Sequence, residues 1–350
     1  MEGIAYTSVE QQIEKLKDQH LIIEDENRAK MMLGLFGYSN IVKSYREPYT
    51  FISDGRKIYR SGITFEQLFS LYILDKNLRN SVIATMIDLE EYIKAAAADV
   101  IGQAFGTHQD QYLNFRNYSN KTKRKYQFTL AGILETMRNT LSTDKNPICH
   151  YITQYGSVPP WILFKSVYFS TIVNFIDQFK TPQKNDMVNK LYDLEALGLS
   201  SEAGRMLMMD TLYICQEYRN IAAHGGRTYN YSPNYSSRIP EIMHFPAENS
   251  ISGFGQLLFI LMLLNYKEPH RRLSNALSKE LNRHCNAYPQ DVTYLGQILN
   301  MNIEPQKIVW VSPNSNKYHN NPHCSGMMGA KKIPFDSEDA KRYIPCKRCI

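Results

Sequence analysis

Apolar residues recur at helical spacing along most of the chain. The clearest stretch runs from 64 to 104, where intervals of three and four residues separate Leu68, Leu71, Leu74, Leu78, Val82, Met86 and Leu89. These intervals place side chains on one face of an α-helix, so a long helix with a buried face is predicted. The same pattern predicts two helices between residue 7 and Pro48, and further helices over 127–141, 160–180, 183–196, 202–224, 253–266 and 268–285.

Turn-forming residues separate the predicted helices. Asp54–Gly55 indicates a short hairpin before the long helix, and the three prolines between 228 and 250 indicate a loop. A β-type pattern appears near residue 306, where the run KIVWVS begins. The predicted fold is mainly α, with a helical N-terminal extension over 1–60, a helical domain over 61–250, C-terminal helices over 251–305 and a small β-containing tail over 306–350.

Composition narrows the class of protein without naming a function. Apolar residues make up 43% and charged residues 21% of the 350 positions, which is typical of a soluble globular protein. A net charge of +6 permits a nucleic-acid partner but does not require one. The N-terminus lacks a signal-peptide pattern, and the longest apolar run, 257–264, is too short to span a membrane. Unevenly spaced cysteines favour a reducing compartment, so we expect a cytoplasmic protein without a membrane partner.

The stretch CQEYRNIAAHGGRTYN, residues 215–230, carries the strongest candidate chemistry. It places Arg219, Asn220 and His224 on the last turns of the predicted helix 202–224, with Glu217 as a further polar support. Five residues turn a helix by about 500°, so Arg219 and His224 point about 140° apart. They converge if the helix frays at Gly225, or if a second copy packs alongside. The alternative is that His224 is a polar residue at a helix end, interacting with the helix dipole.

The C-terminal tail contains a metal-ligand pattern. His319, Cys324, Cys346 and Cys349 form a compact set that ends in Cys–x2–Cys, which suits one tetrahedral zinc ion. His323 competes with His319 as the fourth ligand, and a coincidental grouping of cysteines is the alternative. A segment of about forty residues cannot build a sufficient core alone, so its folding would need the metal. With the shell closed, the zinc would be structural.

Two groups of basic residues are candidates for binding nucleic acid. The first lies in the polar loop 115–127, between Tyr118 and Tyr126, and the second lies on the predicted helix 268–285. Tyrosines next to cations suit stacking on bases and contact with phosphates, although a solvated basic loop is the ordinary interpretation. The candidate residues are Lys121, Lys123, Arg124, Lys125, Arg271 and Arg272.

Four blocks of sequence resemble the Abi-like abortive-infection proteins of the AbiD and AbiF type, which act in bacterial phage defence. The resemblance covers roughly residues 8–245 and is carried by GLFGYSNIVKSYREPY, ITFEQLFSLYILDKNLRNSVIATMIDLEEYIKAAAADVIGQAFG, PPWILFKSVYFSTIVNFIDQF and YRNIAAHGGRTYN. That family belongs to the all-helical HEPN superfamily, in which Arg–x4–6–His marks metal-independent ribonucleases. Arg219, Asn220 and His224 match this motif. The tail resembles a separate zinc-binding appendage, through Tyr318–His319, Cys324 and the run PCKRC at 345–349.

The resemblance implies a HEPN-type helical bundle and a defence endoribonuclease that needs no metal for catalysis. It also implies RNA as the substrate, a homodimer with one motif per chain, and control by, or complex formation with, a small structured non-coding RNA. A non-cleaving RNA-binding protein of a defence ribonucleoprotein is the alternative. A helical scaffold for protein interactions is a third hypothesis, favoured if Arg219 and His224 are buried and satisfy each other.

Overall fold

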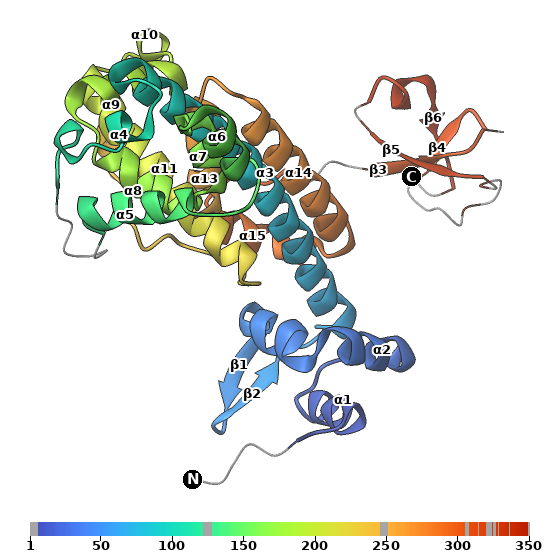
Figure 1. The fold of residues 1–350 in the computed structure, drawn as a ribbon. Helices are drawn as coiled ribbons and strands as arrows, with labels where there is room; N and C mark the ends of the chain where they lie inside the picture. The colour runs from blue at the N-terminus through green and yellow to red at the C-terminus, as the bar shows by residue number, and fades with distance from the viewer. Residues whose placement is uncertain are drawn as a thin grey trace. The chain divides into compact units, whose positions relative to one another are not determined.

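The computed structural model describes residues 6–121, 128–245, 251–304, 308–313, 315–319, 324, 327, 329–335 and 337–348. Helices dominate the chain and the C-terminal region holds a small sheet, which confirms the predicted mainly-α fold class with a β-containing tail (Figure 1). The chain divides into two compact units, Leu78–Asn275 and the combination of Met1–Asn77 with Ala276–Ile350. Both boundaries fall inside helices, α3 (Phe65–Phe105) and α14 (Glu268–Ala287). The four predicted domains, and the three boundaries between them, stay predictions.

The unit Leu78–Asn275 is built around α11 (Ser201–Ala223), which packs against α8 (Phe169–Asp177), α9 (Thr181–Leu191), α12 (Ile239–Ile242) and α13 (Gly253–Leu263). Every residue from 207 to 215 of α11 is buried, so neighbouring elements enclose this stretch on all sides, and Leu207, Leu212 and Ile214 have no exposed surface. The other elements of this unit are α4 (Gln109–Tyr112), η3 (Phe115–Asn117), α5 (Leu130–Leu141), α6 (Ile148–Tyr155), α7 (Pro160–Leu163), η4 (Phe164–Ser166) and α10 (Leu194–Leu197).

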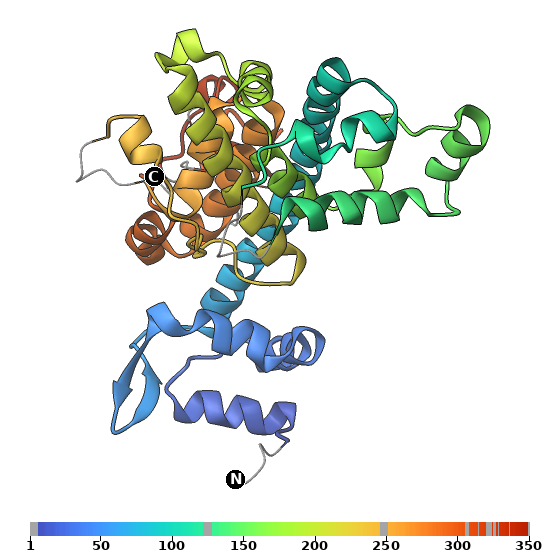
Figure 2. The same cartoon turned by 60° about the vertical axis from the view of Figure 1, so that its left-hand side comes forward.

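The second unit begins with α1 (Val9–Asp18), α2 (Glu26–Phe36), the π-helical turn η1 (Ser39–Lys43) and η2 (Glu47–Tyr49). Strands β1 (Thr50–Ser53) and β2 (Arg56–Tyr59) follow and form the hairpin seen in Figure 2. Ser53 pairs with Arg56, and the two residues between them, Asp54 and Gly55, both have positive φ. That geometry is a type I′ turn, so the predicted hairpin is confirmed. After α14 come η6 (Pro289–Asp291) and α15 (Val292–Leu299).

A buried polar network ties segments of this second unit together. The Asp291 carboxylate accepts hydrogen bonds from Tyr49 Oη at 2.7 Å, Gln67 Nε2 at 2.9 Å and His284 Nε2 at 2.8 Å. Because a carboxylate only accepts, His284 carries a proton on Nε2, and its Nδ1 is hydrogen-bonded to Ser70 Oγ at 2.9 Å. These groups are matched donor to acceptor, which is the condition under which a buried polar network stabilises a fold.

The C-terminal sheet has the strand order β5–β3–β4–β6, formed by β3 (Ile308–Val311), β4 (Lys317–His319), β5 (Lys331–Pro334) and β6 (Ile344–Pro345). A short turn, η7 (Ala340–Arg342), precedes the last strand. Strand β4 pairs antiparallel with β3 and parallel with β6. In the described part of the chain, no helix combines the length and the hydropathy that crossing a membrane needs.

Two of the predicted helices differ from the observed ones. The stretch 160–180 is broken into α7, η4 and α8, with extended backbone at Val167 and Tyr168 between them. The stretch 183–196 is split into α9 and α10, because Tyr192 is extended and Asp193 caps the second helix. The helices α4, α6, α12 and α15 were not predicted, and the short helix α12 lies within 228–250, which was expected to be a loop. The apolar residues of 160–180 are nearly continuous, so their spacing does not reveal the break that positions Tyr168.

Candidate functional site

Helix α11 ends in a turn that presents His224. His224 is the last residue of helical character, and Gly225 follows with a φ of 74°. The Gly226 N–H donates to the Ile221 carbonyl at 2.9 Å, and the Gly225 N–H donates to that of Ala222 at 3.2 Å. This pair of bonds is a Schellman motif, in which the left-handed position favours glycine. The chain therefore leaves α11 directly after His224.

A cation from α3 holds this turn in place. Arg79 Nη1 donates to the carbonyl oxygens of Gly225 at 3.0 Å and Gly226 at 3.4 Å. A guanidinium at a helix C-terminus also interacts favourably with the negative end of the helix dipole. Arg79 thus fixes the backbone on which His224 sits.

The loop after α11 folds back along the helix. Glu217 accepts from Tyr231 Oη at 2.8 Å and from the Asn234 N–H at 2.6 Å. Further along, the buried Asp210 carboxylate accepts from the Arg238 guanidinium at 2.8 Å. Glu217, expected beside the reactive groups, is therefore engaged in holding the loop.

Arg219 and Asn220 line a small depression between α11 and the start of α8. Its volume is about 60 Å³, and its lining residues are Tyr168, Phe169, Ser170, Gln216, Arg219 and Asn220. Gln216, Arg219 and Asn220 share one face of α11, since residues three and four apart are neighbours on a helix. The other wall is the first turn of α8.

The depression is suited to an anion. The backbone N–H groups of Phe169 and Ser170, at the positive end of α8, have no acceptor among the described residues. Within the same residues, the Arg219 guanidinium and the Asn220 amide make no hydrogen bond or ion pair, although both line the depression. Free N–H groups at a helix N-terminus together with a guanidinium form a typical phosphate site. The buried Gln216 Oε1 also lacks a hydrogen-bond donor.

His224 is exposed and, as far as the described residues show, does not line this depression. It follows Asn220 by four residues, so it lies on the same stripe of α11, one turn beyond the depression. Its imidazole has no partner among the described residues. Within a single chain, Arg219 and Asn220 therefore line the same depression, whereas His224 is exposed at the C-terminal end of α11.

The residues predicted to bind RNA are placed as follows. The backbone of Lys121 is fixed by Gln178, whose side chain bonds both its N–H and its carbonyl at 2.7 Å. Lys123, Arg124 and Lys125 lie outside the described residues. Arg271 makes two bonds to Glu268, at 2.7 and 2.8 Å, and Arg272 pairs with Asp88 at 2.8 Å. The charges on α14 are thus partly neutralised, and all six assignments stay predictions.

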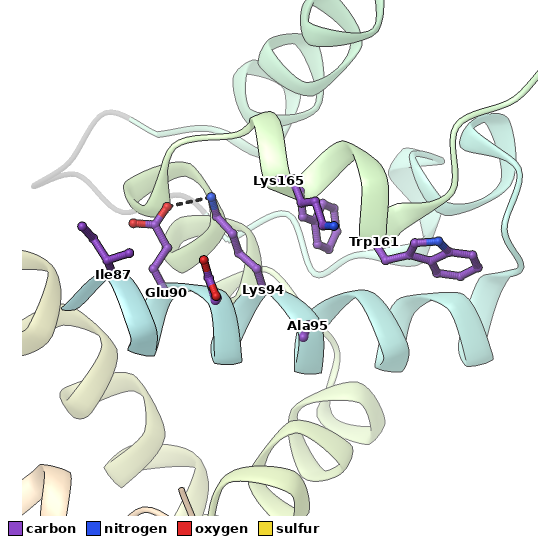
Figure 3. Close-up of a pocket in the computed structure, with 8 residues that line it drawn as sticks. Ile87, Glu90, Lys94, Ala95, Trp161 and Lys165 are labelled. Atoms are coloured by element: carbon purple, nitrogen blue, oxygen red, sulfur yellow. Dashed lines mark ion pairs between the residues drawn. The ribbon is translucent and has the colours of Figure 1, made fainter. Parts of the chain in front are cut away.

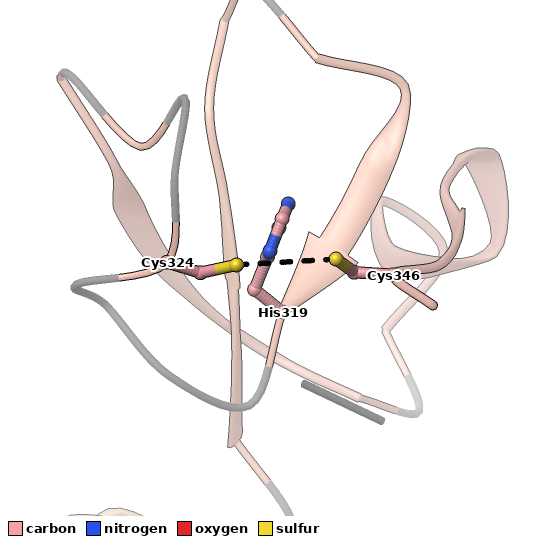
Figure 4. A group of neighbouring side chains, drawn as sticks. All are labelled: His319, Cys324 and Cys346. Atoms are coloured by element: carbon pink, nitrogen blue, oxygen red, sulfur yellow. Dashed lines mark hydrogen bonds between the residues drawn. The ribbon is translucent and has the colours of Figure 1, made fainter. Parts of the chain in front are cut away.

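Three of the four predicted metal ligands converge in the C-terminal sheet (Figure 4). The pairing of Tyr318 with Pro345 brings His319 beside Cys346. The candidate ligand atoms of His319, Cys324 and Cys346 lie within 4.8 Å of one another, and the two sulfurs are 4.0 Å apart. Tetrahedral zinc with Zn–S bonds of about 2.3 Å separates two sulfurs by about 3.8 Å, so this set fits the ion. Cys349 and His323 lie outside the described residues.

A larger groove runs between α3 and the α7–η4 segment (Figure 3). Its volume is about 660 Å³, and its walls include Ile87, Trp161 and Phe164. Glu90 and Lys94 form an ion pair across 2.6 Å within it. Its charges largely cancel, since Glu91 and Lys165 also line it. The groove contains none of the predicted site residues and lacks the net positive charge that an anion site needs.

The sequence did not indicate Tyr168, Ser170 or Gln216 as site residues. Gln216 could have been found, because it precedes Arg219 by three residues and Asn220 by four on one helical face. Tyr168 and Ser170 come from α8, and only the packing of α8 on α11 brings them to the site.

A family model described as Abi-like protein matches residues 31–230, more than half of the chain. No curated protein and no solved structure matches the chain.

Proposed function

The chain belongs to the Abi-like protein family, which implies a part in abortive-infection defence, and we propose that it acts there as a metal-independent endoribonuclease of the HEPN type. RNA is the proposed substrate. The enzyme would be a toxin that a small non-coding RNA restrains or accompanies, since an unrestrained ribonuclease harms its own host.

One observation carries the proposal. Arg219 and Asn220 face an anion-sized depression whose opposite wall is the N-terminus of α8, and the guanidinium has no acceptor among the described residues. Guanidinium groups without an acceptor are well suited to phosphates, because their donors match two phosphate oxygens. The depression therefore suits the scissile phosphate of RNA.

RNA supplies its own nucleophile, so the protein needs only proton transfer and charge stabilisation. In the proposed reaction the 2′-oxygen attacks phosphorus and the P–O5′ bond breaks. The 2′-hydroxyl gives up its proton to a base, and an acid donates a proton to the leaving 5′-oxygen. His224 would accept or donate these protons, because an imidazole exchanges protons near neutral pH. Arg219 would stabilise the charge that builds on the phosphate oxygens, and Asn220 would orient it. The products are a 2′,3′-cyclic phosphate and a 5′-hydroxyl.

A homodimer would complete the site. His224 lies beyond the depression that holds Arg219 in the same chain, while both are on one accessible end of α11. Two copies of α11 placed side by side in an isologous pair would bring each His224 towards the other copy's depression. The arrangement within one chain supports this composite site.

In the tail, we propose a structural zinc ion held by His319, Cys324 and Cys346, with Cys349 as the fourth ligand. The three described donors fit tetrahedral zinc, and a closed shell leaves no position for a substrate. The ion would stabilise the small sheet.

The alternative is an RNA-binding protein that does not cut. The position of His224 outside the depression favours it, since phosphate binding by Arg219 needs no proton transfer. In that case, binding would depend on Arg219 together with the basic residues predicted to contact RNA, among them Lys121, Arg271 and Arg272.

The test compares wild type with His224→Ala and Arg219→Ala in cleavage of purified RNA and in toxicity to cells. Under the nuclease proposal, His224→Ala loses cleavage by about 100-fold or more and keeps RNA affinity, whereas Arg219→Ala loses both. Cleavage should persist with a chelator present, and products should carry a cyclic phosphate. Equal toxicity of wild type and both variants would contradict the proposal. His244→Ala, on the loop beyond α12, is the matched control and should behave as wild type.

A further inference from the structure

An exposed aromatic ring stands at the edge of the depression beside Arg219. Tyr168 is 78% exposed and lines the depression, whereas its neighbour Phe169 is 2% exposed. In the described part of the chain, the Tyr168 ring packs against no other ring and its hydroxyl has no partner. Leaving such a large apolar surface in water is unfavourable, so a ligand that covers the ring would be favoured.

The ring is held on a rigid base. Tyr168 is the N-cap of α8, and its carbonyl accepts from the Thr171 N–H at 3.0 Å and the Ile172 N–H at 3.2 Å. Little backbone entropy is therefore lost when a ligand stacks there, which is the benefit of a preorganised contact.

The size of the depression determines which part of a ligand enters it. About 60 Å³ holds a few heavy atoms, such as a phosphoryl group, but not a nucleoside. A base attached to a phosphate at Arg219 must therefore lie outside the depression. Of the residues that line it, Tyr168 offers an exposed aromatic face at the rim.

We propose that this site takes one unpaired nucleotide of single-stranded RNA, with its phosphate at Arg219 and its base stacked on Tyr168. The ring makes the site selective, because a base inside a duplex has both faces covered by its neighbours and cannot stack on a protein side chain. Cleavage is therefore restricted to loops and unpaired ends. The inference rests on the proposed ribonuclease function and names the form of RNA that this function acts on.

The experiment uses one fluorescent RNA strand, free and annealed to its complement, with the full-length protein. Cleavage is measured as kcat/KM with wild type, Tyr168→Ala, Tyr168→Trp and Tyr155→Ala, and binding is measured by anisotropy with the same changes in the His224→Ala background. Tyr155 is the matched control, since it is a 68% exposed tyrosine on α6 that does not line the depression. Light scattering gives the oligomeric state of each variant.

We expect the free strand to be cut and the duplex to be spared. Tyr168→Ala should lower kcat/KM and RNA affinity by about 10- to 100-fold, the usual effect of removing one stacking ring. Tyr168→Trp should retain both quantities, and Tyr155→Ala should match wild type.

Three results would overturn the inference: equal cutting of duplex and free strand, wild-type behaviour of Tyr168→Ala, or a fall in activity that accompanies loss of the dimer. The last result would assign the ring to contact with a second copy. Failure of the ribonuclease proposal gives a different pattern, in which His224→Ala cuts as well as wild type or no variant cuts RNA. In that case, the anisotropy of the free RNA strand with His224→Ala, measured with and without Tyr168→Ala, still shows whether Tyr168 contributes to binding unpaired RNA.

Discussion

Arg219 differs from the arginines that stabilise the helices around it. Arg79 and Arg238 each meet oxygen acceptors, the first at backbone carbonyls and the second at the buried Asp210. Arg219 faces the depression on α11 with no such acceptor in the described structure. An unpaired guanidinium beside free N–H groups is typical of ligand sites, because a guanidinium without an acceptor contributes nothing to the stability of the fold. The same comparison places Glu217 with the structural residues, since it holds the loop after α11.

Lys184 offers a test of stability against pH at the residue scale. Its side chain is 8% exposed and lies 3.3 Å from Asp177, and burial lowers the pKa of Lys184 to about 8. In the unfolded chain its pKa is near 10.5, so between pH 8 and 10.5 the unfolded chain binds more protons and stability from this group rises with pH. Relative to Lys184→Met, the free energy of unfolding of wild type should rise by about 1–2 kcal/mol from pH 8 to 10.

The measurement is urea unfolding of both proteins across this range, with the difference taken at each pH so that titrating tyrosines cancel. A constant difference would show that Lys184 titrates as it does in water. Lys190→Met is a suitable control, because Lys190 is about one-third exposed and pairs with Asp99 at the surface.

The sequence identified residues within one helix better than residues brought together by packing. Arg219, Asn220 and His224 share one stretch, so their spacing made them candidates and the match to the motif of the resembling family favoured them. The site also uses Tyr168 and Ser170, from a helix start that the continuous apolar run at 160–180 conceals. The network around Asp291 joins residues more than 200 positions apart, and no local pattern records such contacts.

At the scale of elements, the end of α11 depends on α3. The Schellman turn leaves its last carbonyls to be satisfied from outside, and Arg79 does so for Gly225 and Gly226. The long helix α3 was predicted from periodicity, yet its polar position 79 gave no sign of this contact. The buried face of α3 made the helix predictable, but the residue that holds the turn carrying His224 is Arg79, on its polar face.

Arg79→Ala should lower the free energy of unfolding by about 1–2 kcal/mol, because two carbonyls lose a charged donor at a helix C-terminus. Under the proposed function, cleavage should fall as well, since His224 lies on the turn that loosens. Chemical denaturation and initial cleavage rates measure the two effects. Arg79→Lys keeps the charge without the planar fork, so it should recover part of the stability. Wild-type stability of Arg79→Ala would exclude this role.

At the scale of the whole molecule, the C-terminal module has a much smaller apolar core than the helices. Its strands have two to four residues each, and its apolar core is small, with Val309, Val311 and Met327 among the buried residues. Short strands over a small core rarely fold without a bound metal or a cross-link, and the proposed zinc ion at His319, Cys324 and Cys346 would stabilise them. The helices have no such requirement, since α11 buries a continuous apolar face.

Removal of zinc should therefore unfold the module and leave the helices folded. The chain has two tryptophans, Trp161 and Trp310, so Trp161→Phe makes fluorescence report on β3 alone. Trp310 pairs with His319 and lies 5.6 Å from the Lys332 ammonium, and loss of the metal should shift its emission to the red as this packing opens. Helical circular dichroism should change little.

Cys346→Ser should show the shifted emission from the start and lose the one bound zinc per chain. RNA cleavage should continue after chelation, because the proposed reaction uses His224 and Arg219 without a metal. Collapse of the helical signal together with the Trp310 shift would instead mean that module and helices unfold as one cooperative unit.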